Sequence, residues 1–192
     1  MNLLTNTNQK IKKTGKMNGV RLYEFNLPAV SSCPFADDCK VYCYAHKGTY
    51  LYRNVQDKYN FNFELTKNID EFKSLIQDEL ESKKVEYVRI HSSGDFYSLK
   101  YLKTWVEIAR SNPNIVFYGY TKSVPLFKHI TAPENFVFCF STGGKKDDMI
   151  KDTDKKAVIF DSMDELKQAG YTNCTENDMA MIEADKIGLV YH

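Results

Sequence analysis

The chain has 192 residues, a length that favours one domain with a substantial buried core. Its 26 Lys and Arg residues nearly balance its 25 Asp and Glu residues, and the net charge of +1 excludes a strongly basic nucleic-acid-binding protein. No apolar run of about 18 residues is present, and the polar N-terminus lacks the apolar segment of a secretory signal. These features predict a cytoplasmic protein without membrane association, in a compartment where disulfides are rare.

The predicted elements alternate between strands and helices. Residues 1–18 are polar and Lys-rich and predict a loose N-terminal arm, followed by a single α/β domain over residues 19–192. Residues 26–54 form a long Cys-rich loop after the first strand. Strands are expected at residues 20–25, 85–90, 115–120, 136–140, 157–160 and 187–191, and helices at residues 69–80, 98–109, 125–129 and 162–170.

Several of these strands are continuous apolar runs, as in a parallel sheet covered on both faces. The fold class is therefore α/β with a mostly parallel sheet, either open or closed part of the way as a partial (βα) barrel. In both arrangements the functional site lies at the carboxyl ends of the strands.

The residues that follow the predicted strands are polar. They include Ser93, Gly94 and Asp95 after one strand, Thr121 and Lys122 after the next, and Ser141 after a third. Such loops bind polar ligands, although Ser and Asp also serve as ordinary turn and helix-capping residues.

Cys33, Cys39 and Cys43 place three thiols within eleven residues. Clustered thiols in a reducing compartment favour a metal site. Structural zinc is one interpretation, but zinc-binding Cys pairs are usually two to four residues apart, and no second pair follows. Three Cys residues on one loop also suit a [4Fe-4S] cluster, whose fourth iron takes a distant ligand or stays open to a substrate. Cys174, in a polar stretch, is the first candidate for that ligand, and Cys139 is the reserve.

Three segments together resemble the phage "gene product 88" family: CPFADDCKVYCYAHKGTY from Cys33, HSSGDFYSLKYLKTW from His91 and FYGYTKS from Phe117. The resemblance spans roughly residues 20–142 and implies a phage protein that acts in the cytoplasm of a bacterial host. The order of the motifs is also distantly similar to that of a shortened radical-SAM enzyme. This similarity implies that the three Cys residues hold the cluster and that Ser93, Gly94 and Asp95 contact S-adenosylmethionine.

Three functions remain open at this stage. In the first, a redox or radical enzyme, Asp95 and Lys122 are the catalytic residues, and Ser93, Gly94, Asp95, Thr121 and Ser141 bind the cofactor. In the second, the cluster or a zinc ion only stabilises a protein that binds and redirects or inhibits a host factor, such as a defence nuclease. In the third, the aromatic and basic residues of the Cys-rich loop and the N-terminal Lys residues bind nucleic acid. His46 and His91 are most simply structural, with roles as ligand and general base as the alternatives.

Overall fold

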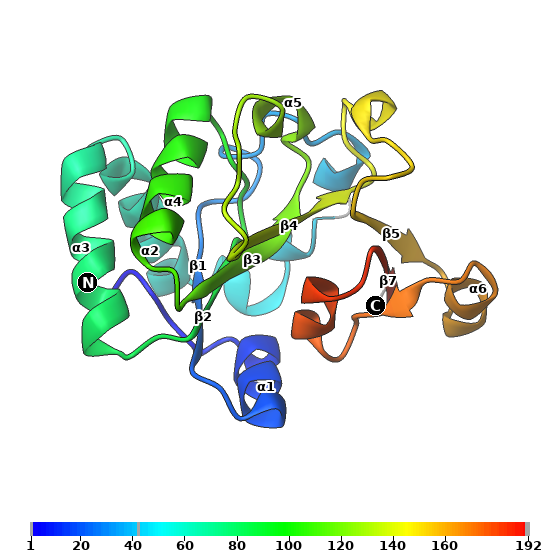
Figure 1. The fold of residues 1–192 in the computed structure, drawn as a ribbon, viewed down its shortest axis with the longest axis horizontal. Coiled ribbons are helices and arrows are strands. Elements are labelled where there is room, and N and C mark those ends of the chain that lie inside the picture. The colour runs from blue at the N-terminus through cyan, green and yellow to red at the C-terminus, as the bar shows by residue number, and fades with distance from the viewer. Residues whose placement is uncertain (1, 42, 191–192) are drawn as a thin grey trace.

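The computed structural model describes residues 2–41 and 43–190. One seven-stranded sheet runs through the molecule in the order β1-β2-β3-β4-β5-β7-β6, and neighbouring strands pair in parallel (Figure 1). The α/β class and the parallel sheet are confirmed, the sheet is not closed, and the partial barrel stays a prediction. The strands are β1 (Leu22–Phe25), β2 (Tyr87–Ile90), β3 (Val116–Thr121), β4 (Phe136–Ser141), β5 (Lys156–Phe160), β6 (Thr172–Asn173) and β7 (Lys186–Val190).

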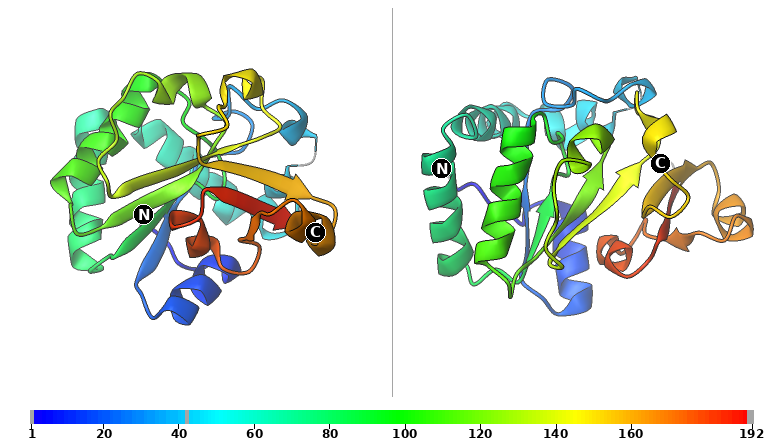
Figure 2. Two further views of the ribbon diagram at one scale, coloured as in Figure 1. Left: turned by 45° about the vertical axis from the view of Figure 1, so that its right-hand side comes forward. Right: turned by 45° about the horizontal axis from the view of Figure 1, so that its top comes forward.

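Helices connect the strands and cover both faces of the sheet (Figure 2). The α-helices are α1 (Gln9–Asn18), α2 (Arg53–Leu65), α3 (Ile69–Ser82), α4 (Leu99–Ser111), α5 (Val124–Phe127) and α6 (Met163–Gln168). Short 3-10 helices are η1 (Asp38–Lys40), η2 (Tyr44–His46), η3 (Gly48–Leu51), η4 (Asp147–Met149) and η5 (Asp178–Ile182). None of the helices in the described part of the chain is long and apolar enough to cross a membrane.

The sheet separates two cores because alternate residues of each strand point to opposite faces. Phe25 of β1 belongs to the larger core, where it meets Phe72 of α3 and Trp105 of α4 at ring-centroid distances of 5.4 and 5.3 Å. The smaller core lies under α1 and η5 and contains Ile11, Leu22, Tyr118, Cys139, Ala157, Cys174, Met181 and Ile187. We call the side of the sheet that packs against α1 and η5, and therefore lines this smaller core, the inner face.

The N-terminal segment is not the loose arm that its composition predicted. Leu3 and Leu4 are each 1% exposed, and the backbone N–H of Leu4 donates to Glu79 of α3 at 2.9 Å. Asn8 caps α1 by accepting a hydrogen bond from the N–H of Lys10, and Ile11 is buried against the sheet. The prediction relied on the Lys-rich composition of the segment. It overlooked the few apolar residues through which the segment packs against the rest of the protein.

Helix α3 allows a direct test of which side chains support the larger core. Ile76 is fully buried, whereas its neighbour Leu75 is 38% exposed, although both belong to the apolar pattern of residues 69–80. We expect Ile76→Ala to lower the free energy of unfolding by about 2–5 kcal/mol because it leaves a cavity. Leu75→Ala is the matched control and costs less than about 1 kcal/mol. Urea denaturation measures both, and equal losses would contradict this packing.

Candidate functional site

The Cys-rich loop begins at a clasp between the ends of β1 and β2. The side-chain oxygen of Asn26 accepts hydrogen bonds from the backbone N–H groups of Ser92 and Ser93, at 2.6 and 3.0 Å. Leu27 and Ser93 are joined twice, since the Leu27 N–H donates to the Ser93 carbonyl and the Ser93 hydroxyl donates to the Leu27 carbonyl, both at 2.9 Å. Ser93 therefore fixes where the loop leaves the sheet.

Gly94 allows the loop to pass close to the end of β2. Its φ of +89° favours glycine, and a Cβ at this position would lie 2.6 Å from both the Leu27 Cβ and the Ser32 Oγ. The glycine thus serves the close approach of two backbone segments, with the Ser32 hydroxyl in turn donating to the Pro28 carbonyl at 2.7 Å.

Asp95 ties β2 to β3 through a buried carboxylate that is 6% exposed. One oxygen accepts from the N–H of Phe96 at 2.7 Å and from the hydroxyl of Thr121 at 2.6 Å. The other accepts from the N–H of Lys122 at 2.8 Å. Burial raises the pKa of Asp95, while these three donors act in the opposite direction.

Lys122 extends this network to β4. Its ammonium group donates to the hydroxyl of Ser141 and to the carbonyl of Thr142, each at 2.8 Å. The polar side-chain groups of Asp95, Thr121, Lys122 and Ser141 therefore have partners within the protein. The structure brings all of the sequence-predicted polar residues together at one edge of the sheet, in an arrangement that positions three strand ends.

The Cys-rich loop crosses this edge and docks on the turn that follows β4, as Figure 1 shows for the blue-to-cyan segment between β1 and α2. Ala36 forms an antiparallel bridge with Gly144, and the N–H of Lys145 donates to the Phe35 carbonyl at 2.9 Å. The Lys145 ammonium group donates to the Pro34 carbonyl at 3.1 Å. The residues just after Cys33 are thus held at the carboxyl end of the sheet.

Cys33, Cys39 and Cys43 are free thiols of intermediate exposure. Burial and the neighbouring charges of Asp95 and Cys39 raise the pKa of Cys33 to about 12. Burial also raises the pKa of Cys43, with Cys39 acting in the same direction and Lys122 opposing it. Cys39 is therefore an electrostatic neighbour of both other thiols. Among residues 2–41 and 43–190, however, no three His, Cys, Asp or Glu side chains are already gathered around one metal position.

Cys174 and Cys139 lie elsewhere, in the smaller core on the inner face. Both are fully buried, and burial raises the pKa of Cys139 to about 12, with the neighbouring Cys174 thiol acting in the same direction. Cys174 follows β6, and its N–H donates to the Gly188 carbonyl at 3.0 Å. Cys139 of β4 and Cys174 after β6 thus belong to the sheet and its smaller core, whereas the other three thiols belong to the Cys-rich loop.

The two histidines differ in burial. His91 is 3% exposed, shares a hydrogen bond of 2.8 Å with the Tyr101 hydroxyl, and has a pKa lowered by burial to about 3. It is therefore neutral at physiological pH and a very weak base, which does not suit the alternative role of general base. His46 is exposed at the end of η2.

A second polar group was missed by the sequence reasoning. This group lies on the inner face of the sheet, where Glu24 of β1 pairs with Arg89 of β2, and Arg89 pairs with Tyr118 of β3. Tyr120 of β3 and the buried Asp178 of η5 complete it. The available signal was the alternation within strands, because Glu24 and Arg89 occupy the inward positions of otherwise apolar runs. Asp178 could not be assigned from sequence, since it reaches this face by long-range packing.

Comparison with known proteins gives a family but no activity. A family model described as Gene product 88 matches residues 2–189. The Gene 88 protein of Mycobacterium phage L5 is 25% identical over 169 residues, which cover 78% of this chain and 71% of the relative. The Gene 88 protein of Mycobacterium phage D29 is 25% identical over 140 residues, which cover 66% of this chain and 58% of that relative. No solved structure matches the chain, and the distant similarity to radical-SAM enzymes has no support.

Gly94 provides a test of the clasp. We expect Gly94→Ala to lower the free energy of unfolding by about 2–4 kcal/mol, because left-handed strain adds to the clash with Leu27 and Ser32. The matched control is Gly48→Ala, where φ is +57° but nothing lies within 4 Å, so only strain of about 1–2 kcal/mol applies. Urea denaturation gives the stabilities, and the reaction rate of the loop thiols with a disulfide reagent reports loosening. Equal effects of the two substitutions would refute the close approach at Gly94.

Proposed function

This chain belongs to the phage Gene product 88 family, and we propose that it is an iron–sulfur protein whose [4Fe-4S] cluster is held by Cys33, Cys39 and Cys43. The observation that carries this proposal is that three unpaired, partly exposed thiols lie on one loop, which is docked at the carboxyl edge of a parallel sheet. Thiolates are the usual ligands of such clusters, so the donor chemistry fits.

Loading requires two changes in the loop. The segment between Cys33 and Cys43 must close around the cluster, and the thiols must lose their protons, which burial of Cys33 and Cys43 opposes in the metal-free protein. Both ends of the loop are already fixed, at Asn26 and Ser93 on one side and by α2 on the other. Closure therefore rearranges only the short segment that carries the thiols, which limits its entropic cost.

The geometry favours a stabilising cluster over the radical-SAM form of the hypothesis. Asp95 and Lys122, the expected catalytic residues, already have their polar groups satisfied by Thr121, Ser141 and backbone partners. A substrate or S-adenosylmethionine would have to displace these buried hydrogen bonds, which costs free energy. In our proposal these residues and Ser93 position the loop, while S-adenosylmethionine binding is an outcome that the experiment distinguishes.

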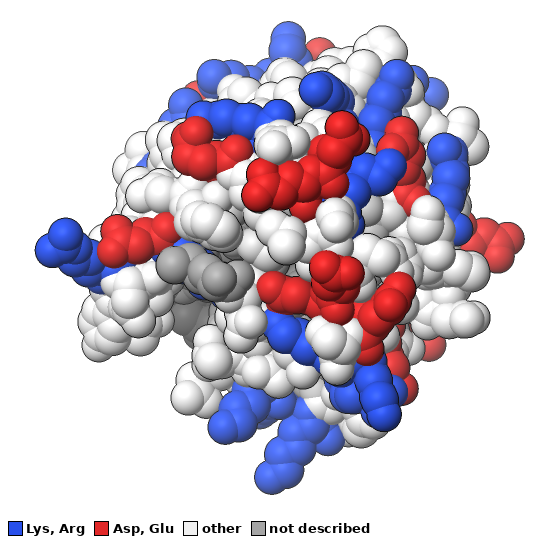
Figure 3. All heavy atoms as spheres, turned by 90° about the vertical axis from the view of Figure 1, so that its left-hand side faces the viewer, with Lys and Arg blue, Asp and Glu red and all other residues white. Residues whose placement is uncertain are grey.

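The loop surface supports binding of a host protein as the role of the loaded form. Val41, Leu51 and Tyr52 are 77%, 59% and 60% exposed, a concentration of large apolar side chains within twelve residues. Nucleic-acid binding has less support, because Lys10 and Lys13 of the N-terminal segment pair with Asp178 and Glu176. Basic and acidic side chains are also interspersed on the face that Figure 3 shows.

Anaerobic purification followed by iron, sulfide and zinc analysis tests the proposal. We expect about four irons and four sulfides per chain, with absorbance near about 400 nm from thiolate-to-iron charge transfer. Cys39→Ser should abolish the absorbance, whereas Cys174→Ser, at a buried thiol on the inner face, is the matched control and should retain it. Loss of the cluster in both variants would restore Cys174 as a ligand, and one zinc without sulfide would overturn the iron–sulfur assignment. A spectral change on adding S-adenosylmethionine would favour the enzyme.

Thiolate ligation also predicts a pH dependence. Because the pKa of Cys33 is about 12 and that of Cys43 is raised, both thiols are protonated near neutral pH and release protons when a metal binds. The two protons from Cys33 and Cys43 alone should therefore raise the affinity for a probe metal, Zn²⁺, by at least about a hundredfold between pH 6.5 and 7.5, in chelator competition. An affinity that does not change with pH would show that these thiols are not the ligands.

A further inference from the structure

The fourth iron of the proposed cluster lacks a ligand, because three Cys residues bind only three of the four irons. Cys139 and Cys174 are fully buried in the smaller core, so a cluster bound to either thiol would have to displace the side chains that enclose it. His91 is buried as well, and its Nε2 already shares a hydrogen bond with the Tyr101 hydroxyl. A ligand from the Cys-rich loop itself would avoid these costs.

Cys43 and His46 share the single turn of η2. Cys43 is the N-cap residue of η2, His46 is its third residue, and the His46 N–H donates to the Cys43 carbonyl at 3.0 Å. The Cys43 sulfur has the backbone N–H of Ala45, one residue before His46, as a hydrogen-bonding neighbour. Side chains at the N-cap and three residues later reach each other in a capping box, and side chains three residues apart eclipse in a 3-10 helix. The thiol and the imidazole therefore belong to the same side of one turn.

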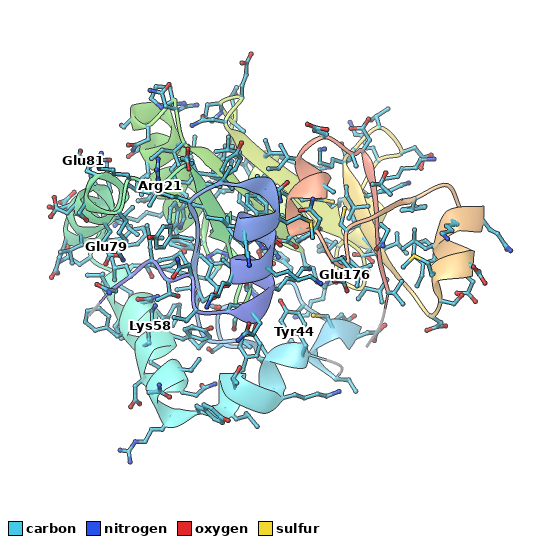
Figure 4. All side chains as sticks on the ribbon, turned by 90° about the horizontal axis from the view of Figure 1, so that it is seen from below. Arg21, Tyr44, Lys58, Glu79, Glu81 and Glu176 are labelled. Carbon is cyan, nitrogen blue, oxygen red and sulfur yellow. The ribbon has the colours of Figure 1, made fainter. Side chains whose placement is uncertain are left out.

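The other two residues of η2 hold this turn in place. The hydroxyl of Tyr44, which Figure 4 shows on the cyan segment, donates to the Ser92 carbonyl after β2. The Tyr44 ring packs edge-on against Tyr50 of η3 at a centroid distance of 5.6 Å, and Ala45 is 3% exposed. His46, in contrast, is exposed, and its ring forms no hydrogen bond or ion pair with the residues that the structure describes. A fixed turn that carries a free imidazole beside a thiol needs little further ordering to bind a metal.

The chemistry of the site also favours an imidazole as the fourth donor. Imidazole nitrogen replaces thiolate on iron in some iron–sulfur centres, whereas carboxylates such as those of the exposed Asp37 and Asp38 suit harder cations. Asp95 is already a negative neighbour of Cys33, and each thiolate adds further negative charge at this edge of the sheet. A neutral imidazole completes the ligand set without adding another negative charge.

From this arrangement we propose that His46 is the fourth protein ligand of the metal centre, together with Cys33, Cys39 and Cys43. This inference rests on the proposed cluster, and it assigns all four ligands to the loop segment between Cys33 and His46. Closure of the loop brings the imidazole to the cluster with the Cys43 thiol, since one turn of η2 carries both. With every iron bound by the protein, none is open to S-adenosylmethionine, and the cluster serves to fix the loop.

Pulsed electron paramagnetic resonance of the anaerobically purified, chemically reduced protein tests this ligand, because a nitrogen bound to iron couples to the unpaired electron of the cluster. We expect the wild-type protein to show a nitrogen coupling that changes when the protein is made with ¹⁵N-labelled histidine. His46→Cys should keep the iron and sulfide content and lose this coupling. His129→Cys, at an exposed histidine after α5, is the matched control and should retain it. In His46→Ala, added imidazole should restore a nitrogen coupling that no longer responds to labelled histidine.

A wild-type cluster without a histidine coupling, or a coupling that survives in His46→Cys, would overturn His46 as a ligand and leave the cluster proposal intact. Zinc without sulfide in the wild-type protein would instead overturn the cluster proposal. The protein loaded with Co²⁺ then tests His46 separately, because the visible absorption of Co²⁺ depends on its ligands. A shift of this absorption in His46→Cys would support His46 as a ligand of that metal, and identical spectra would overturn it. Absence of any bound metal would overturn both proposals.

Discussion

The carboxylate of Asp95 is the constraint on which the carboxyl edge of the sheet depends. A parallel sheet holds its strands together by backbone hydrogen bonds, but the segments beyond the strand ends have no such ladder. Asp95 replaces it after β2 and β3 by accepting from Thr121 and from the backbone of Lys122. Lys122 then reaches Ser141, the last residue of β4, so one buried carboxylate and one ammonium group join three successive strand ends.

This polar chain explains why the Cys-rich loop has a defined position although little of it is regular structure. The loop starts at the Asn26–Ser93 clasp on one side of Asp95 and meets the Gly144 turn on the other. A charged network is suited to this role because each buried acceptor is costly to leave unpaired, which makes alternative loop positions unfavourable. The motif around Gly94 is thus explained by packing and hydrogen bonding before any chemistry is assigned to it.

The spacing of apolar residues predicted the architecture, because the buried side of each strand or helix leaves its own pattern in a short stretch of sequence. The apolar runs at Val88 and Phe117 identified strands, and the α3 pattern placed Phe72 and Ile76 in the core. Contacts between residues far apart in the sequence could not be predicted in this way. The docking of Leu3 and Leu4 depends on Glu79, seventy-five residues away, and no local pattern carries that information. The parallel topology brings the site residues at the strand ends together, as expected. That these residues satisfy one another's hydrogen-bonding groups depends on interatomic distances, which a sequence does not contain.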